Sequence, residues 1–309
     1  MSFTTDIKQE IAFNDLKDCC AKAQLSALIQ LCSSLSISNQ RYILIIKTEN
    51  SSTAKRILKL VKSIYKAEIE LSVIQKLNLK KNKIYELRVI TNAINILEDL
   101  MIYKDGFNEH PPMTLFKKEC CIRAYIAGAF LSIGSCNSHA KSNYHLELAT
   151  NTDKYAQFLN KLLNKYELNS KVVQRRTKYV VYIKVADKIS NFLKCVGAHE
   201  SLLNFENIRI ERDFMNSFVR LDNCELANEM KSINAANNQL DDIILIEEKT
   251  LTTHLDPKLK VIMNLRKQYP EYSLNELCIE YEKETKTKIT KSGIRHRFNK
   301  IHELANKYR

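Results

Sequence analysis

The chain has 309 residues, a length typical of about two domains rather than of one small module. Its composition, 45% hydrophobic and 27% charged, is that of a globular protein and excludes wholesale disorder. Lys and Arg outnumber Asp and Glu, 48 to 35, and the net charge of +13 favours polyanionic partners, nucleic acid before an anionic membrane surface. No stretch approaches the roughly 20 apolar residues that span a bilayer, and residues 1–12 lack the apolar segment of a signal peptide. We therefore expect a soluble, cytoplasmic protein without a membrane partner.

The chain contains an internal repeat. Residues 19–34 (CCAKAQLSALIQLCSS) are similar to residues 120–135 (CCIRAYIAGAFLSIGS), at an offset of 101 positions. The same succession follows each segment: a strand at 42–48 or 144–150, an amphipathic helix at 53–66 or 153–166, a strand pair at 69–74 with 84–90 or 171–175 with 179–185, and a short helix at 92–100 or 187–195. An αββαββα unit therefore occurs twice, at about 15–103 and 113–200, and we predict an α+β domain over residues 1–215.

The first helix of each copy carries small residues on neighbouring turns, which are Ala23, Ser26 and Ala27 in one copy and Ala124, Ala127 and Gly128 in the other. Small side chains let two helix backbones approach closely. Of the five glycines in the chain, Gly128 and Gly134 both lie in this segment. We expect the two helices to pack together on a pseudo-twofold axis; the alternative is an independent Ala-rich core helix in each copy.

The nine cysteines predict no cofactor. Their number is odd, there is no CxxC motif, and the adjacent pairs at 19–20 and 120–121 suit neither a disulfide framework nor tetrahedral zinc ligation. Cys136-x-x-His139, with His145 nearby, is half of a metal motif without its second half. We expect reduced, mostly buried thiols and no metal.

Residues 126–134 (IAGAFLSIG) resemble the LAGLIDADG motif of homing endonucleases, a family with a duplicated αββαββα fold. In that family the two motif helices meet at the dyad, and each ends with an acid that ligates the divalent metal cutting DNA. The matching positions here are Ile133 and, by the offset, Cys32, and neither can ligate a hard cation such as Mg²⁺. We expect neither leading helix to contain Asp or Glu. The resemblance thus implies the fold without catalytic residues, and we expect no enzyme activity.

Residues 216–250 predict a connector helix. Its partial apolar stripe, interrupted at 237–239, consists of Leu226, Met230, Ile233, Leu240, Ile243 and Ile244. Residues 251–309 predict three helices with N-terminal caps at Asp256, at Ser273 (a capping box with Glu276) and at Thr290. The third helix has an apolar side formed by Ile294, Phe298, Ile301, Leu304 and Ala305. Such an all-α trihelical unit with a cationic last helix is typical of a helix-turn-helix domain, here at about 273–306.

Charge favours DNA binding over a structural role for this unit. Residues 286–309 contain eight Lys or Arg and one acid, a net charge of +7 and more than half of the chain's +13. We predict that these residues bind double-stranded DNA: Lys291, Ser292, Gly293, Arg295, His296, Arg297, Asn299 and Lys300.

The types of these residues suggest different roles. Arg295 and Asn299 can make bidentate contacts with guanine and adenine, whereas Lys291, Ser292 and Lys300 suit phosphates. We expect Gly293 to leave backbone amides at the helix N-terminus open to a phosphate.

Three separated parts of the chain together resemble the WhiA family. They are residues 2–12 (SFTTDIKQEIA), 220–228 with 232–243 (RLDNCELAN and SINAANNQLDDI), and 289–305 (ITKSGIRHRFNKIHELA). That bacterial family fuses a degenerate LAGLIDADG-like domain to a C-terminal helix-turn-helix. The resemblance implies a nucleoid-associated DNA-binding protein in cell division and chromosome segregation, or in transcription regulation of sporulation genes, with other division or transcription proteins as partners.

Two other functions are left open: an active LAGLIDADG-type endonuclease, and a scaffold whose N-terminal domain binds proteins while the helix-turn-helix tethers it to the nucleoid.

A second DNA surface is also predicted, because six cations lie in or beside equivalent hairpins that would face a DNA saddle in the nuclease-like fold. They are Lys80, Lys81, Lys83, Arg175, Arg176 and Lys178. The alternative for these six is ordinary surface charge.

Overall fold

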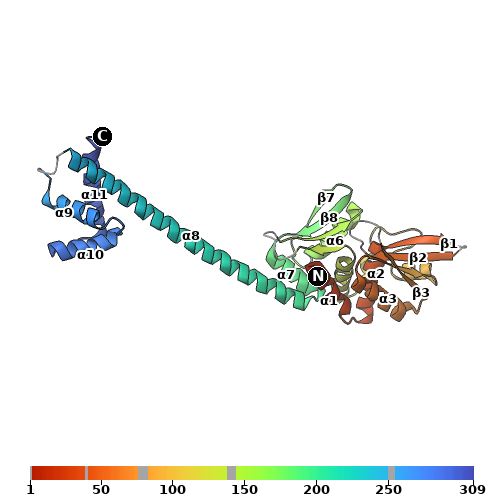
Figure 1. Cartoon of the computed structure of the whole chain (residues 1–309). Coiled ribbons are helices and arrows are strands. Elements are labelled where there is room, and N and C mark those ends of the chain that lie inside the picture. Colours follow the sequence, from red (N-terminus) through yellow and green to blue (C-terminus); the bar gives the residue numbers. More distant parts are fainter. Residues whose placement is uncertain (1, 39–40, 76–82, 138–143, 250–254) are drawn as a thin grey trace. The chain divides into compact units, whose positions relative to one another are not determined.

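The computed structural model describes residues 2–38, 41–75, 83–137, 144–249 and 255–309 (Figure 1). The chain divides into two compact units, residues 1–211 and 212–309. No helix among the described residues combines the length and the apolar character that crossing a membrane requires.

The first unit contains the predicted αββαββα arrangement twice. The first copy comprises α2 (Asp18–Cys32), β1 (Ser33–Ser38), β2 (Arg41–Thr48), α3 (Ser51–Tyr65), β3 (Ile69–Gln75), β4 (Lys83–Val89) and α4 (Ala93–Asp99). After a short 3₁₀ helix (Met113–Leu115), the second comprises α5 (Glu119–Ile133), β5 (Gly134–Cys136), β6 (Leu146–Thr150), α6 (Asp153–Asn164), β7 (Lys171–Arg175), β8 (Lys178–Ile183) and α7 (Ala186–Val196). Both ends of α2 and α5 correspond at an offset of 101 residues, as the repeat predicts.

Each copy builds one antiparallel four-stranded sheet, in the order β1-β2-β4-β3 or β5-β6-β8-β7. The inner strands bury alternate residues against the helices, for example Leu44 paired with Val89 and Leu146 paired with Ile183. The first strand of each sheet begins directly after its helix, and neither was placed from the sequence. In β1 the reason is a serine-rich run with only two apolar residues, Leu35 and Ile37.

The helices α2 and α5 pack against each other at very short range. A Cβ atom added to Gly128 would lie 2.5 Å from the backbone oxygen of Gln24 and 3.0 Å from the Cβ of Ala27. Only a glycine therefore fits at this crossing. The predicted close packing of the two helices is confirmed, and the alternative of two independent core helices is wrong.

Two expectations about these helices differ from the structure. Each does contain an acid, since α2 begins at Asp18 and α5 at Glu119, although these lie at the opposite end from Cys32 and Ile133. At that N-terminal end the two cysteine pairs come together, one pair from each copy. The sequence had indicated that these adjacent pairs do not form a common site. Their four Sγ atoms lie within 4.8 Å of one another.

A helix that the sequence did not reveal, α1 (Phe3–Phe13), completes the first unit. It buries Phe3, Ile7 and Ile11, spaced four residues apart, in the same core as α2 and α5. Its Glu10 carboxylate accepts hydrogen bonds from the backbone amides of Glu200 and Ser201 at the start of the next long helix. A carboxylate in this position satisfies free N–H groups and complements the helix dipole.

That helix, α8 (His199–Glu248), runs from the first unit into the second. Its last turns bury Ile243 and Ile246 in the core formed by α9 (Pro257–Gln268), α10 (Leu274–Thr285) and α11 (Lys291–Asn306). The C-terminal core is therefore built from four helices rather than three. The prediction of an apolar stripe along the connector helix is largely wrong. Four of its six residues have exposed side chains, and these are Leu226, Met230, Ile233 and Ile244.

Candidate nucleic-acid interface

The candidate recognition helix α11 is fixed to the core along its predicted apolar side. Ile294, Phe298, Ile301 and Ala305 are buried. The helix begins as expected at Thr290, whose Oγ1 accepts a hydrogen bond from the Gly293 amide over 3.2 Å. The caps predicted at Asp256 and Ser273, including the capping box with Glu276, are also present.

The opposite side of α11 is exposed and basic. Six of the eight predicted DNA-binding residues have exposed side chains, and these are Lys291, Ser292, Arg295, His296, Asn299 and Lys300. Lys and Arg are well suited to phosphate oxygens, and Arg and Asn can also read base edges in the major groove. The helix therefore presents both kinds of donor on the face that the core leaves open.

The other two residues, Gly293 and Arg297, are placed differently. The Gly293 amide is engaged by Thr290, so it is not open to a phosphate as we expected. A Cβ at this position would lie 3.0 Å from Ile289, which gives the glycine a packing reason. The guanidinium of Arg297 lies 4.8 Å from the ring centroid of Tyr281, and its Nη1 is buried, so Arg297 holds α11 against α10.

A buried arginine that the sequence did not single out supports the turn before α10. Arg266 in α9 is only 2% exposed. Its Nη1 donates hydrogen bonds to the carbonyl oxygens of Pro270 and Tyr272, over 3.2 and 2.6 Å, and its guanidinium lies 5.5 Å from the ring centroid of Phe298. Burial lowers the pKa of Arg266 from its ordinary value. One side chain thus joins α9, the following turn and the recognition helix.

The end of α11 is held by a carboxylate from α8. Asp242, which is 3% exposed, accepts a hydrogen bond from Arg309 Nη2 over 3.0 Å and lies 2.7 Å from His302 Nδ1. Asp242, His302 and Arg309 therefore fix the C-terminal end of α11. The first turns of the same helix carry the exposed basic face.

In the first unit, the positions that match the nuclease acids lie at the C-terminal ends of α2 and α5. Cys32 and Ile133 line one hollow there, together with Lys8, Ser132 and Glu49. Burial lowers the pKa of Lys8 to about 8, and it raises the pKa of the Cys32 thiol. A thiol and an isoleucine therefore stand at the two positions where the resemblance would place the carboxylates that hold Mg²⁺, and Lys8 and Glu49 line the same hollow.

The predicted second surface is only partly brought together. Lys80 and Lys81 lie outside the described residues. The open face of each sheet is the face that the helices do not cover. Lys83 pairs with Gln75, and strand alternation places it on the same side of β4 as the buried Leu87. Lys83 therefore does not belong to the open face of its sheet. In the second sheet, Arg175 and Lys178 face each other across β7 and β8.

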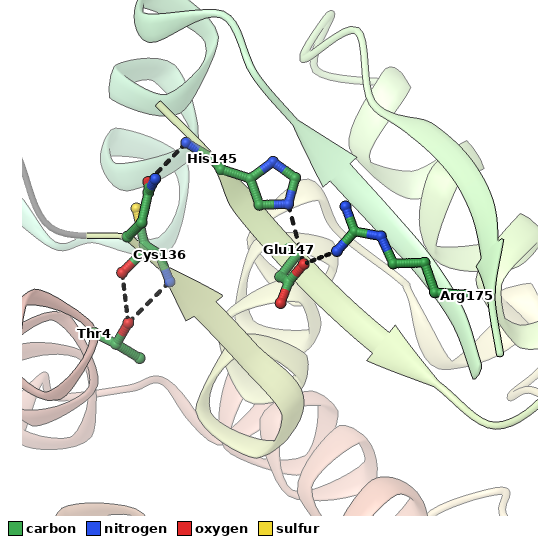
Figure 2. A network of polar contacts seen from close by, with 6 residues as sticks. Thr4, Cys136, His145, Glu147 and Arg175 are labelled. Carbon is green, nitrogen blue, oxygen red and sulfur yellow. Dashed lines mark hydrogen bonds and ion pairs between the residues drawn. The ribbon is translucent and has the colours of Figure 1, made fainter. Parts of the chain in front are cut away.

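Arg175 is held by an ion pair on this open face. Its Nη1 lies 3.0 Å from Glu147 Oε2, and the same oxygen lies 3.0 Å from His145 Nε2 (Figure 2). Nearby, the backbone amide and carbonyl of Cys136 both bond Thr4 Oγ1. Of the half metal motif suggested above, Cys136-x-x-His139 with His145 nearby, the His145 ring thus has a carboxylate partner, only the backbone of Cys136 makes these contacts, and His139 lies outside the described residues.

Three family models match this chain in succession. They are the WhiA N-terminal LAGLIDADG-like domain at residues 18–103, the WhiA LAGLIDADG-like domain at 122–215 and the WhiA C-terminal HTH domain at 218–305. The chain belongs to the WhiA family. The "Probable cell division protein WhiA" of Bacillus licheniformis is 45% identical over 311 residues, covering 100% of this chain and 98% of that protein. The protein of the same name from Bacillus cereus is 43% identical over 311 residues, again covering 100% of this chain and 98% of that protein.

Solved WhiA structures have the same fold. Full-length DUF199/WhiA from Thermatoga maritima matches with a TM-score of 0.60 and 22% identity, covering 100% of this chain and 99% of that one. A structure of the N-terminal LAGLIDADG domain of DUF199/WhiA matches with a TM-score of 0.50 and 18% identity, covering 63% of this chain and 90% of that one. The WhiA family and the predicted fold class, a duplicated LAGLIDADG-like domain followed by a helix-turn-helix domain, are thereby confirmed.

Proposed function

We propose that this protein binds double-stranded DNA through the exposed face of α11 and acts on the nucleoid in cell division and chromosome segregation or in transcription regulation, without cutting DNA. The observation that carries the proposal is the amphipathic division of α11, in which Ile294, Phe298 and Ile301 are buried while Arg295 and Asn299 are exposed. A purely structural helix would not need base-reading side chains on its free face. The name of the Bacillus relatives, probable cell division protein, supports the cellular role.

The helix ends of the first unit support a role without nuclease chemistry. Metal-ion cleavage of DNA needs oxygen ligands at the dyad. There, Cys32 and Ile133 take the matching positions, and Lys8 adds a cation to the same hollow. We expect no Mg²⁺-dependent or Mn²⁺-dependent cutting of supercoiled plasmid by the pure protein. Divalent-dependent nicking that disappears when residues around Ile133 are changed would contradict this.

Genome-wide DNA co-precipitation in cells tests the cellular role, with the Arg295→Ala/Asn299→Ala double variant as the matched control. Discrete promoter peaks that the variant loses would support transcription regulation, and broad coating of the chromosome would support a nucleoid role. If wild-type protein enriches no DNA above the background of an untagged strain, the proposal is wrong.

A further inference from the structure

Four cysteines gather where α2 and α5 begin. Cys19 and Cys20 come from α2, Cys120 and Cys121 come from α5, and the four Sγ atoms all lie within 4.8 Å of one another. The Sγ atoms of Cys19 and Cys20 are 3.9 Å apart. Because the two pairs correspond at the offset of 101 residues, each copy of the repeat contributes one pair to a single cluster between the two helices.

These distances suit one metal ion. Zinc–sulfur bonds of ~2.3 Å in a tetrahedron place the sulfur atoms ~3.8 Å apart, so a small contraction of this cluster would reach that geometry. Four sulfur ligands favour a soft or borderline ion with tetrahedral coordination and disfavour Mg²⁺ and Ca²⁺. Cys20 and Cys121 are buried, while Cys19 and Cys120 are half-buried, which leaves a side open for an ion to enter.

The N-terminal ends of the two helices also suit thiolate ligands. Helix N-termini stabilise a thiolate, and here two helices start beside the sulfurs. Any thiol protons that remain would be displaced when an ion binds.

We propose that Cys19, Cys20, Cys120 and Cys121 bind one structural Zn²⁺ that clamps the two halves of the duplicated domain at the dyad. The site lies at the opposite end of α2 and α5 from Cys32 and Ile133, so it has no part in the chemistry of the nuclease motif. Four protein ligands close the coordination sphere, which is the arrangement of a structural rather than a catalytic zinc. This inference is independent of the proposed DNA binding.

Metal analysis of the full-length protein, purified without chelators under reducing conditions, tests the proposal. We expect about one zinc per chain, with four thiols that react with a thiol reagent only after the metal is removed. Cobalt added to the metal-free protein should give a thiolate-to-cobalt charge-transfer band and the intense visible bands of tetrahedral coordination. Because this titration uses wild-type protein, it does not depend on the folding of any variant.

The matched variants are Cys19→Ser/Cys120→Ser, which removes one ligand from each copy, and Cys224→Ser/Cys278→Ser, which removes two cysteines outside the cluster. The first should lower zinc content to below roughly a tenth of an equivalent and abolish the tetrahedral cobalt spectrum, while the second should change neither. Three results would overturn the proposal: zinc-free protein that shows no tetrahedral cobalt spectrum, zinc that persists in the first variant, or a disulfide within the cluster in freshly isolated protein.

Discussion

Arg266 Nε donates a hydrogen bond to Gln239 Oε1 over 3.0 Å, and this contact ties the end of the long helix α8 to the helix-turn-helix core. In the sequence, Gln239 belongs to a polar run that interrupts an apolar stripe. In the structure, its amide oxygen is one of the acceptors that satisfy a buried guanidinium, which costs free energy when left unpaired. Gln239, which interrupts the stripe, is therefore a hydrogen-bond partner of Arg266.

Arg266→Met should destabilise the second unit by roughly 1.5–3 kcal/mol, because carbonyl oxygens of the turn before α10 lose a charged donor. Urea unfolding of the full-length protein, followed by circular dichroism, measures the change. The neighbouring Lys267→Met, which removes an ion pair with the surface carboxylate of Glu247, should shift stability by less than about 0.5 kcal/mol. Equal stability of both variants and wild type would show that Arg266 is dispensable.

The features predictable from the sequence were those with a local or repeating signal. The duplication, the apolar side of α11 and the caps at Ser273 and Thr290 each depend on spacings of a few residues or on one constant offset. The contact between Arg266 and Gln239 had no such signal, because pairing across 27 residues depends on the assembled core. The α1 helix did carry one, the four-residue spacing of Phe3, Ile7 and Ile11, and it was overlooked.

The same limit applies to the candidate sites. The exposed face of α11 follows from the geometry of a single helix, so Arg295 and Asn299 could be placed in advance. The four-cysteine cluster could not, since it exists only once two segments 101 residues apart pack side by side. Arg297 was misjudged for a related reason: its aromatic partner, Tyr281, comes from another helix.

The half-buried Lys8 predicts a pH-dependent difference in stability. Burial lowers its pKa from the ordinary 10.5 to about 8, so between these pH values the unfolded chain holds more of this proton and the free energy of unfolding rises with pH. Lys8→Met removes the cost of burying the charge. It should therefore be more stable than wild type at pH 7, and the difference should shrink as the pH rises from about 8 towards 10.5.

Thermal unfolding of both proteins at pH 7 and pH 10 checks this, with the exposed Lys62→Met as the control. A contact of the Lys8 ammonium, 5.9 Å from the Phe130 ring centroid, opposes the effect. If Lys8→Met is less stable than wild type by the same amount at both pH values, packing rather than charge determines the role of Lys8.

The cations of the second sheet should contribute unequally to DNA affinity. If this sheet contacts DNA, Arg176→Ala/Lys178→Ala should reduce the slope of log K against log[salt] by up to about two. Arg175→Ala should change it by less than about one, because Glu147 already neutralises part of that charge over 3.0 Å. Glu147→Gln releases Arg175 and should strengthen binding at low salt.

Salt titrations on a random duplex measure these effects, since phosphate contacts do not depend on base sequence. If the double variant and Glu147→Gln both leave affinity and slope unchanged, the sheet is not a DNA surface. Its open face then becomes a candidate for protein partners.

The recognition helix allows the sharpest prediction. Arg295 and Asn299 are exposed on the side of α11 away from Ile294 and Phe298, so replacing either with Ala should leave the fold intact. Loss of a bidentate base contact should cost roughly 1–3 kcal/mol at the preferred site and little on random DNA. Lys300→Ala should instead weaken both kinds of binding alike and reduce the salt slope by about one.

Phe298→Ala distinguishes loss of contacts from loss of structure. Phe298 packs in the core and against the Arg266 guanidinium, so the truncation should cost roughly 3–5 kcal/mol and abolish binding by unfolding the unit. Each variant is titrated with salt on preferred and random duplexes, and its helicity is followed by circular dichroism. If Arg295→Ala and Asn299→Ala retain both full helicity and full discrimination, these side chains do not read bases, and α11 enters the groove in another orientation.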